Sequence, residues 1–206
     1  IRLLEQMKNH GSNISFLALR PADSAETVTA WQMALENKTT PTGLILSRQK
    51  IKDLPAKGKA RIDDAKEARK GAYVVYEPKD KPDIILVSNG SEVSTVYDAI
   101  QLLEKEKNIN ARLVSVISEG LFRQQTKDYQ IQIIPPAIPA FGVTASIAST
   151  LKGLVGHTGD VFGMEHFGYS APAKVLDDQF GYNGAKIAEK IITYLEKQTR
   201  KEFQAK

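Results

Sequence analysis

Hydrophobic and polar residues follow one another along the chain in blocks that predict strands and helices in alternation. ISFLALR (14–20) is a short apolar run, which predicts a buried strand. The segment 24–37 predicts a helix with Asp23 or Ser24 as its cap. LILS (44–47) predicts the next strand. A strand, a helix and a strand within this length predict two parallel strands joined by a right-handed crossover.

A second and longer run of strands and helices begins at residue 83. Strands are predicted at DIILVSNG (83–90), ARLVSVIS (111–118), IPAFGVTAS (138–146) and DVFGMEHFG (160–168), and helices at 91–106, 121–134, 173–181 and 184–199. Such alternation predicts an α/β protein with a mostly parallel sheet flanked by helices, a three-layer α/β/α architecture.

The segment between the two runs has a different composition. Residues 51–80 are rich in Lys, Asp, Pro and Gly and contain few large apolar side chains. We interpret this segment as a linker between two units, with Ala72–Tyr76 as a possible edge strand. The chain opens with IRLLEQMKNHG, where apolar residues have helical spacing and no initiator Met is present. This opening is typical of the second half of an amphipathic helix, so we expect the chain to be a fragment of a longer protein.

Composition excludes several classes of function. The 206 residues carry a net charge of +4, with 28 Lys and Arg interleaved with 24 Asp and Glu, so no nucleic-acid partner is expected. No apolar run approaches the roughly 18 residues of a membrane helix. The chain has no cysteine, which excludes disulfides and thiolate chemistry. A cytoplasmic protein fits this composition.

Few residues carry a recognisable catalytic pattern. The histidines His10, His157 and His166 are far apart and form no metal-binding pair, so no metal site and no catalytic residue is predicted. SNGSEV (88–93) places a glycine and a serine where a strand turns into a helix. This turn is either a possible anion site or, as we favour, a plain glycine turn with a serine cap.

Arg48 is the candidate for ligand binding. It follows directly after the apolar strand predicted at 44–47, at the carboxyl end of a parallel strand. A guanidinium presents a planar fork that matches two oxygens of a phosphate or a carboxylate. From the residues alone, Arg48 either binds an anion or forms a salt bridge to a neighbouring loop.

Four short motifs occur in a fixed order along the chain. They are LRPAD (19–23), PTGLILSRQ (41–49), GSEV (90–93) and FGYSAPA (167–173). Their order and spacing resemble those of the transketolases over essentially the whole chain, which would match the C-terminal third of those enzymes. Each motif is weak alone, but four in order with consistent gaps are specific.

The resemblance implies a function for the longer protein. Transketolases use thiamine diphosphate and a divalent cation, Mg²⁺ or Ca²⁺, to move a two-carbon ketol unit from a ketose phosphate to an aldose phosphate, and they work as homodimers. The arginine of their LSRQ motif binds the substrate phosphate, and Arg48 is the matching position. The metal ligands and catalytic histidines would lie upstream of Ile1, so this chain alone is expected to be inactive and to bind no cofactor.

The same resemblance implies a division of the chain. Residues 1–50 would be the remnant of the pyrimidine-binding domain, 51–80 its linker, and 81–206 the C-terminal domain. Two alternatives stay open. One is a fragment of a related thiamine enzyme, such as a deoxyxylulose-phosphate synthase or a dehydrogenase β chain. The other is a free-standing module for assembly or ligand binding.

Overall fold

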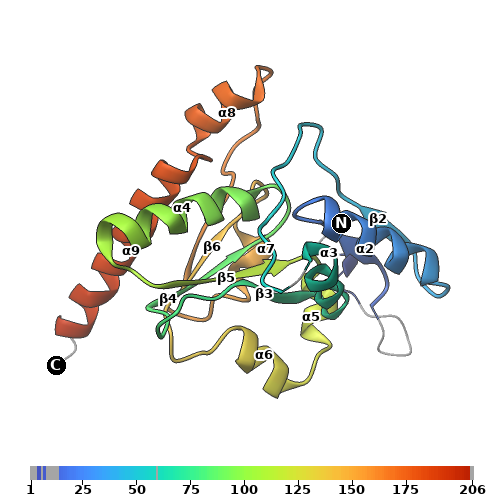
Figure 1. The fold of residues 1–206 in the computed structure, drawn as a ribbon, viewed down its shortest axis with the longest axis horizontal. Helices are drawn as coiled ribbons and strands as arrows, with labels where there is room; N and C mark the ends of the chain where they lie inside the picture. Colours follow the sequence, from blue (N-terminus) through green and yellow to red (C-terminus); the bar gives the residue numbers. More distant parts are fainter. Residues whose placement is uncertain (1–3, 6, 8–13, 59, 205–206) are drawn as a thin grey trace.

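Two sheets organise the chain in the computed structural model, which describes residues 4–5, 7, 14–58 and 60–204. A five-stranded sheet lies at the centre, and a two-stranded sheet lies beside it (Figure 1). The strands are β1 (Leu17–Leu19), β2 (Thr42–Leu44), β3 (Ala72–Tyr76), β4 (Ile84–Ser88), β5 (Ala111–Val116), β6 (Ala140–Val143) and β7 (Asp160–Phe162).

Helices separate most of these strands. They are α2 (Ser24–Glu36), α3 (Arg61–Asp64), α4 (Glu92–Lys107), α5 (Glu119–Arg123), α6 (Lys127–Ile133), α7 (Ser149–Lys152), α8 (Ala173–Phe180) and α9 (Gly184–Gln204), with a 3-10 helix, η1 (Ala65–Lys70), after α3. Within the described part of the chain, no helix is long and apolar enough to cross a membrane.

The large sheet has the strand order β3-β5-β4-β6-β7. Strand β4 is parallel to both of its neighbours, β5 and β6, and β7 is parallel to β6. Strand β3 forms one edge, as predicted, and is antiparallel to β5 with a register shift between Val74 and Tyr76. The predicted mostly parallel sheet is confirmed.

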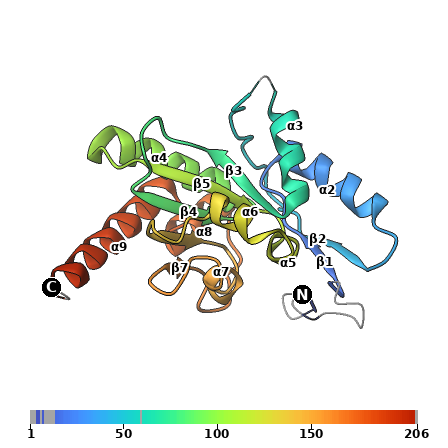
Figure 2. The same ribbon diagram turned by 90° about the horizontal axis from the view of Figure 1, so that it is seen from below.

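Each face of the large sheet has its own hydrophobic core. Successive side chains of β4 alternate between them, because a strand points consecutive residues to opposite faces. Ile84 and Leu86 pack under α4 and α9, whereas Ile85 and Val87 pack against α5, α6 and α7. Figures 1 and 2 show α4 and α9 on one side of the sheet and α6 on the other. The three-layer α/β/α prediction is therefore confirmed.

The β1–α2–β2 unit has the predicted topology. Its strands are parallel, and α2 connects them. Asp23 is the N-cap, because its carboxylate accepts a hydrogen bond from the Glu26 amide. The second strand, however, lies earlier than the predicted LILS (44–47). It ends at Leu44, because β1 ends at Leu19, and the last backbone bond between the two segments in the described part of the chain is that from the Ile45 amide to the Leu19 carbonyl.

Other boundaries also differ from the predicted ones. The predicted helix 121–134 is two short helices, α5 and α6, with Thr126 capping the second. The strand predicted at 160–168 ends at Phe162. Beyond Phe162 the regular ladder stops, because the partner strand β6 already ends at Val143, although the Met164 amide still donates to the Ser146 carbonyl at 2.8 Å. The amphipathic helix predicted for the opening segment IRLLEQMKNHG lies mostly outside the described residues.

A buried polar cluster joins α2 to the edge strand of the large sheet. Asp23 and Glu26 have fully buried side chains and share Arg61, which donates hydrogen bonds of 2.7 Å and 3.3 Å to them. Tyr73 of β3 donates to Glu26, and the Leu54 amide donates to Asp23. Each carboxylate thus has several donors, which offset part of the cost of its burial.

Candidate phosphate pocket

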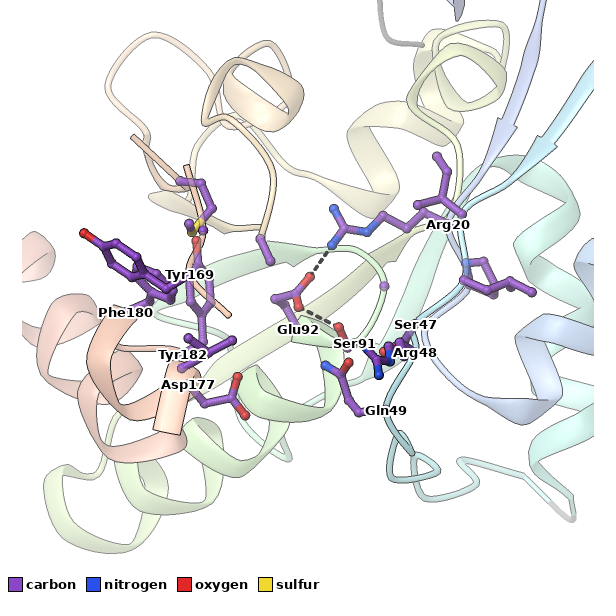
Figure 3. A pocket seen from close by; sticks show the side chains of 18 residues that line it. Arg20, Ser47, Arg48, Gln49, Ser91, Glu92, Tyr169, Asp177, Phe180 and Tyr182 are labelled. Atoms are coloured by element: carbon purple, nitrogen blue, oxygen red, sulfur yellow. Dashed lines mark hydrogen bonds and ion pairs between the residues drawn. The ribbon is translucent and has the colours of Figure 1, made fainter. Parts of the chain in front are cut away.

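A cavity of about 360 Å³ opens at the carboxyl ends of the strands. One wall is the segment after β2, from Ile45 to Gln49, and the base is the turn between β4 and α4. The opposite wall comes from the region of α8, with Tyr169, Phe180 and Tyr182 (Figure 3). We call this cavity the switch-point pocket, because it lies where connections from β4 and β6 leave in opposite directions.

The sequence-predicted residue Arg48 lines this pocket. It is exposed and lies in the irregular segment that follows β2. Among the described residues, no carboxylate or carbonyl accepts a hydrogen bond from its guanidinium. By contrast, Arg61, Arg69 and Arg112 each pair with an acidic side chain. The salt bridge to a neighbouring loop, which the sequence left open for Arg48, is therefore not seen within the described part.

The glycine turn SNGSEV forms the base of the pocket. Gly90 has a φ of 63°, which favours glycine. Ser91 stands at the cap position of α4, but its hydroxyl donates to Glu92 at 2.6 Å and caps no backbone amide. The predicted position of the serine is confirmed, whereas the capping hydrogen bond is not formed.

An ion pair lies beneath this turn. Nη2 of Arg20 donates to Oε2 of Glu92 at 2.7 Å (Figure 3). Nη1 of Arg20 donates to the Thr144 hydroxyl at 3.2 Å. The side chains of Arg20 and Glu92 are only 18% and 8% exposed. The Thr144 hydroxyl in turn donates to Asn89. The pair therefore belongs to a polar network that joins the ends of β1, β4 and β6.

The aromatic wall of the pocket includes a titratable group. The rings of Tyr169 and Phe180 stack with centroids 5.5 Å apart. Asp177 lies on the same side of the pocket, and its pKa is raised above the usual value by partial burial and then by the negative charge of Glu92. Tyr182 donates its hydroxyl to the Thr144 carbonyl, so its phenol has a structural role.

The described residues do not fit a divalent cation. No group of three or more His, Cys, Asp or Glu side chains among them could hold a metal ion. His157 and His166 are exposed and lie outside any such group, and His10 falls outside the described residues. The described residues therefore supply no set of side chains that would hold a metal ion on its own.

Comparison with known proteins decides the family. Residues 71–183, more than half of the chain, match the model of the transketolase-like TK C-terminal domain. The chain belongs to the transketolase family. It is 34% identical to the transketolase of Aquifex aeolicus over 92% of its own length, but it spans only 27% of that relative. It therefore corresponds to a C-terminal part of a transketolase.

Solved transketolase structures agree with this assignment. The enzyme from Leishmania mexicana superposes with a TM-score of 0.74 and 33% identity, over 91% of this chain and 25% of that one. A Pichia stipitis transketolase, solved in complex with sedoheptulose 7-phosphate, superposes with a TM-score of 0.76 and 31% identity over 88% and 25% of the two chains.

Sequence reasoning did not single out Arg20 or Glu92 in this transketolase segment. A signal was present, because Arg20 also follows a buried apolar strand, in the same way as Arg48. The partner could not be identified, however, since Glu92 lies 72 positions further along the chain. Both residues occur in motifs that carried the family resemblance, LRPAD and GSEV.

Proposed function

We propose that this chain is the C-terminal part of an enzyme that transfers a two-carbon ketol unit between a ketose phosphate and an aldose phosphate, and that Arg48 binds the substrate phosphate. The proposal rests on the position and the pairing of the Arg48 guanidinium. This group lines the switch-point pocket, is exposed, and has no acidic partner among the described residues. An exposed guanidinium whose N–H donors have no acidic partner can donate two hydrogen bonds to the oxygens of a phosphate.

The substrate class has support from a relative. The Pichia stipitis transketolase structure contains sedoheptulose 7-phosphate, a ketose phosphate, and its fold matches this chain. A phosphate at the end of a sugar is an exposed dianion, and a cation at the mouth of a pocket can bind it without being buried itself. The aromatic wall on the opposite side limits the pocket laterally.

The cofactor belongs to the longer enzyme. Thiamine diphosphate and a divalent cation are proposed for it, as is a cytoplasmic homodimer. The resemblance implies that the residues that hold the thiamine ring and its metal lie outside this chain, so this chain alone should not bind the cofactor. Calorimetry of the 206-residue chain with thiamine diphosphate and Mg²⁺ should show no heat of binding. A micromolar dissociation constant would contradict this assignment of the cofactor site to residues upstream.

The proposal is tested by replacing Arg48 in the full-length enzyme. A charged hydrogen bond contributes about 1.5–3 kcal/mol, so Arg48→Ala should lower kcat/KM for a phosphorylated sugar roughly ten- to a hundredfold. Arg48→Lys keeps the charge but loses the fork, and should restore only part of this loss. Lys50→Ala is the matched control, because Lys50 is exposed but does not line the pocket.

A sugar without its phosphate provides the decisive comparison. If Arg48 binds the phosphate, the Arg48→Ala variant and the parent should use the unphosphorylated sugar almost equally. If kcat/KM falls equally for both sugars and the melting temperature falls as well, Arg48 stabilises the segment after β2 and does not bind the substrate.

A further inference from the structure

Arg20 contacts the ends of three neighbouring strands of the large sheet. Its amide donates to the Ile117 carbonyl after β5 at 2.8 Å, and its carbonyl accepts from the Gly90 amide after β4 at 3.3 Å. Its guanidinium reaches Thr144 after β6 at 3.2 Å. One residue of the β1 segment is thus attached to the carboxyl edge of the sheet by both its backbone and its side chain.

The Arg20 side chain occupies the place where α/β sheets commonly bind ligands. Such sheets bind them outside the carboxyl ends of the strands, where the connections diverge, here between β4 and β6. A Cβ atom at Gly90 would lie 2.5 Å from Nε of Arg20. The guanidinium therefore packs directly on the glycine turn and fills this crevice from within the chain.

The position of Arg48 depends on this anchorage. The Leu19 carbonyl, next to Arg20, accepts a hydrogen bond from the Ile45 amide at 2.8 Å, and the segment that carries Arg48 starts there. Beyond Ile45, the described structure contains no backbone hydrogen bond that fixes residues 46–49 to the large sheet. The next attachment along the chain is the exposed pair of Lys52 with Asp98 of α4 at 2.7 Å, so the near end of the segment that carries Arg48 is held next to Arg20.

Charge gives the pair a second effect on the pocket. Glu92 and Arg48 line the same pocket, and the Glu92 carboxylate would repel a bound phosphate if it stood alone. Arg20 neutralises it at 2.7 Å. Removal of Arg20 would leave a nearly buried negative charge in the pocket, and would also loosen the near end of the segment that carries Arg48.

We propose that Arg20 and Glu92 are positioning residues of the switch-point pocket, which hold the Arg48 segment over the sheet and keep the pocket electrostatically open to a sugar phosphate. This inference rests on the proposed function of Arg48. It assigns the crevice of the large sheet to an internal arginine, and the substrate phosphate to the pocket above it.

The test uses the full-length enzyme with the variants Arg20→Gln, Glu92→Gln and the double variant. Arg20→Gln should raise KM for the phosphorylated sugar about tenfold and change its kcat by less than about twofold. The kcat/KM for the unphosphorylated sugar should also change by less than about twofold. Glu92→Gln keeps an oxygen that can accept from Arg20 and removes the negative charge, so any rise in KM should be clearly smaller than in Arg20→Gln. In the double variant, the increase in the logarithm of KM should be at most half of the increase seen in Arg20→Gln.

Arg69→Gln is the matched control. Arg69 also pairs with a glutamate, Glu36, but it lies outside the switch-point pocket and is 40% exposed. Arg69→Gln should leave KM and kcat unchanged for both sugars. If Arg20→Gln fails to fold, Arg20→Lys replaces it, and should give a smaller rise in KM that is again confined to the phosphorylated sugar. Failure of both to fold would make Arg20 a folding residue and overturn the proposal.

The outcomes separate this inference from the proposed function. The inference is overturned if Arg20→Gln lowers kcat/KM equally for both sugars. It is also overturned if KM rises as much in Glu92→Gln as in Arg20→Gln, because the pair would then be purely structural. An unchanged KM in Arg20→Gln overturns it as well. Arg48→Ala is measured in parallel: if that variant also fails to discriminate between the sugars, the proposed function itself is wrong.

Discussion

The hydroxyl of Tyr73 donates a hydrogen bond of 2.8 Å to Oε1 of Glu26, and both side chains are buried. Tyr73 belongs to the edge strand β3, and Glu26 to helix α2. The bond therefore joins the five-stranded sheet to the β1–α2–β2 unit. Because a buried acceptor that loses its donor is costly, this contact is where the stability of the junction can be measured.

Removal of the Tyr73 hydroxyl should destabilise the chain. Tyr73→Phe leaves Glu26 with one fewer donor in a site that water does not reach, so the free energy of unfolding should fall by about 1–3 kcal/mol in urea titrations. Tyr76→Phe is the matched control. Tyr76 donates to Glu104 in a partly exposed site, where water can replace the lost donor. A cost below about 1 kcal/mol is expected there, and equal costs would contradict the prediction.

Removal of Arg61 should cost more. Its side chain is 12% exposed and pairs with two carboxylates that are fully buried. Breaking a buried ion pair by removing one partner typically costs about 3–5 kcal/mol, so Arg61→Ala should lower the urea midpoint strongly or prevent folding. Lys66→Ala removes an exposed pair with Asp63 and should cost at most about 1 kcal/mol. A small effect of Arg61→Ala would mean that water enters the cluster.

Glu26 should make stability depend on pH. Burial raises its pKa above the ordinary value of 4.5, and this effect outweighs the hydrogen bond from the Ala22 amide, which lowers the pKa. The folded state then binds the proton more tightly than the unfolded state. Its contribution to stability is fully present below about pH 4.5 and is lost as the pH rises through the folded pKa. The free energy of unfolding of the parent relative to Glu26→Gln should therefore fall as the pH rises from this value.

Glu36 provides the opposite sign. Its hydrogen bond with Arg69 lowers its pKa, so its contribution is present above the ordinary value of 4.5 and is lost as the pH falls through the folded pKa. Urea unfolding of the parent, Glu26→Gln and Glu36→Gln over a series of pH values should give two differences of opposite slope. A difference for Glu26→Gln that does not vary with pH would remove Glu26 as a source of pH dependence.

Hydrogen exchange should distinguish the two sheets. Strand β2 is half-buried and pairs only with β1, whereas Ile84–Ser88 is fully buried between two neighbours. The amides of β2 and of Ile45 should therefore exchange through smaller openings than those of β4. Equal protection would indicate one cooperative core, and the boundary predicted near residue 80 would then be wrong.

The sequence predicted the fold best where a pattern is local. The apolar run at 83–90 and the alternation after it led directly to the central sheet, because buried parallel strands require continuous apolar residues. The end of β2 could not be predicted in this way. It is set by the end of β1, a long-range pairing that leaves Ile45 and Leu46 exposed although they are apolar.

The site was predicted in part. Arg48 lines a pocket at the carboxyl edge of the sheet, although its role stays a prediction, as does the division of the chain at residues 50 and 80. Glu92 and Arg20 were not predicted as a pair, since a helix-starting glutamate and a strand-ending arginine have many possible partners. Only the fold brings them to 2.7 Å.

The edge strand β3 has a consequence for how these molecules behave at high concentration. The carbonyls of Ala72 and Val74, two residues apart and so on the same side of the strand, accept hydrogen bonds from the hydroxyl of Tyr129 and the ammonium of Lys57. A strand from a neighbouring molecule would have to displace both side chains and then accommodate the register shift before Tyr76. These contacts thereby protect this edge of the sheet against edge-to-edge pairing with a second molecule, and so against aggregation.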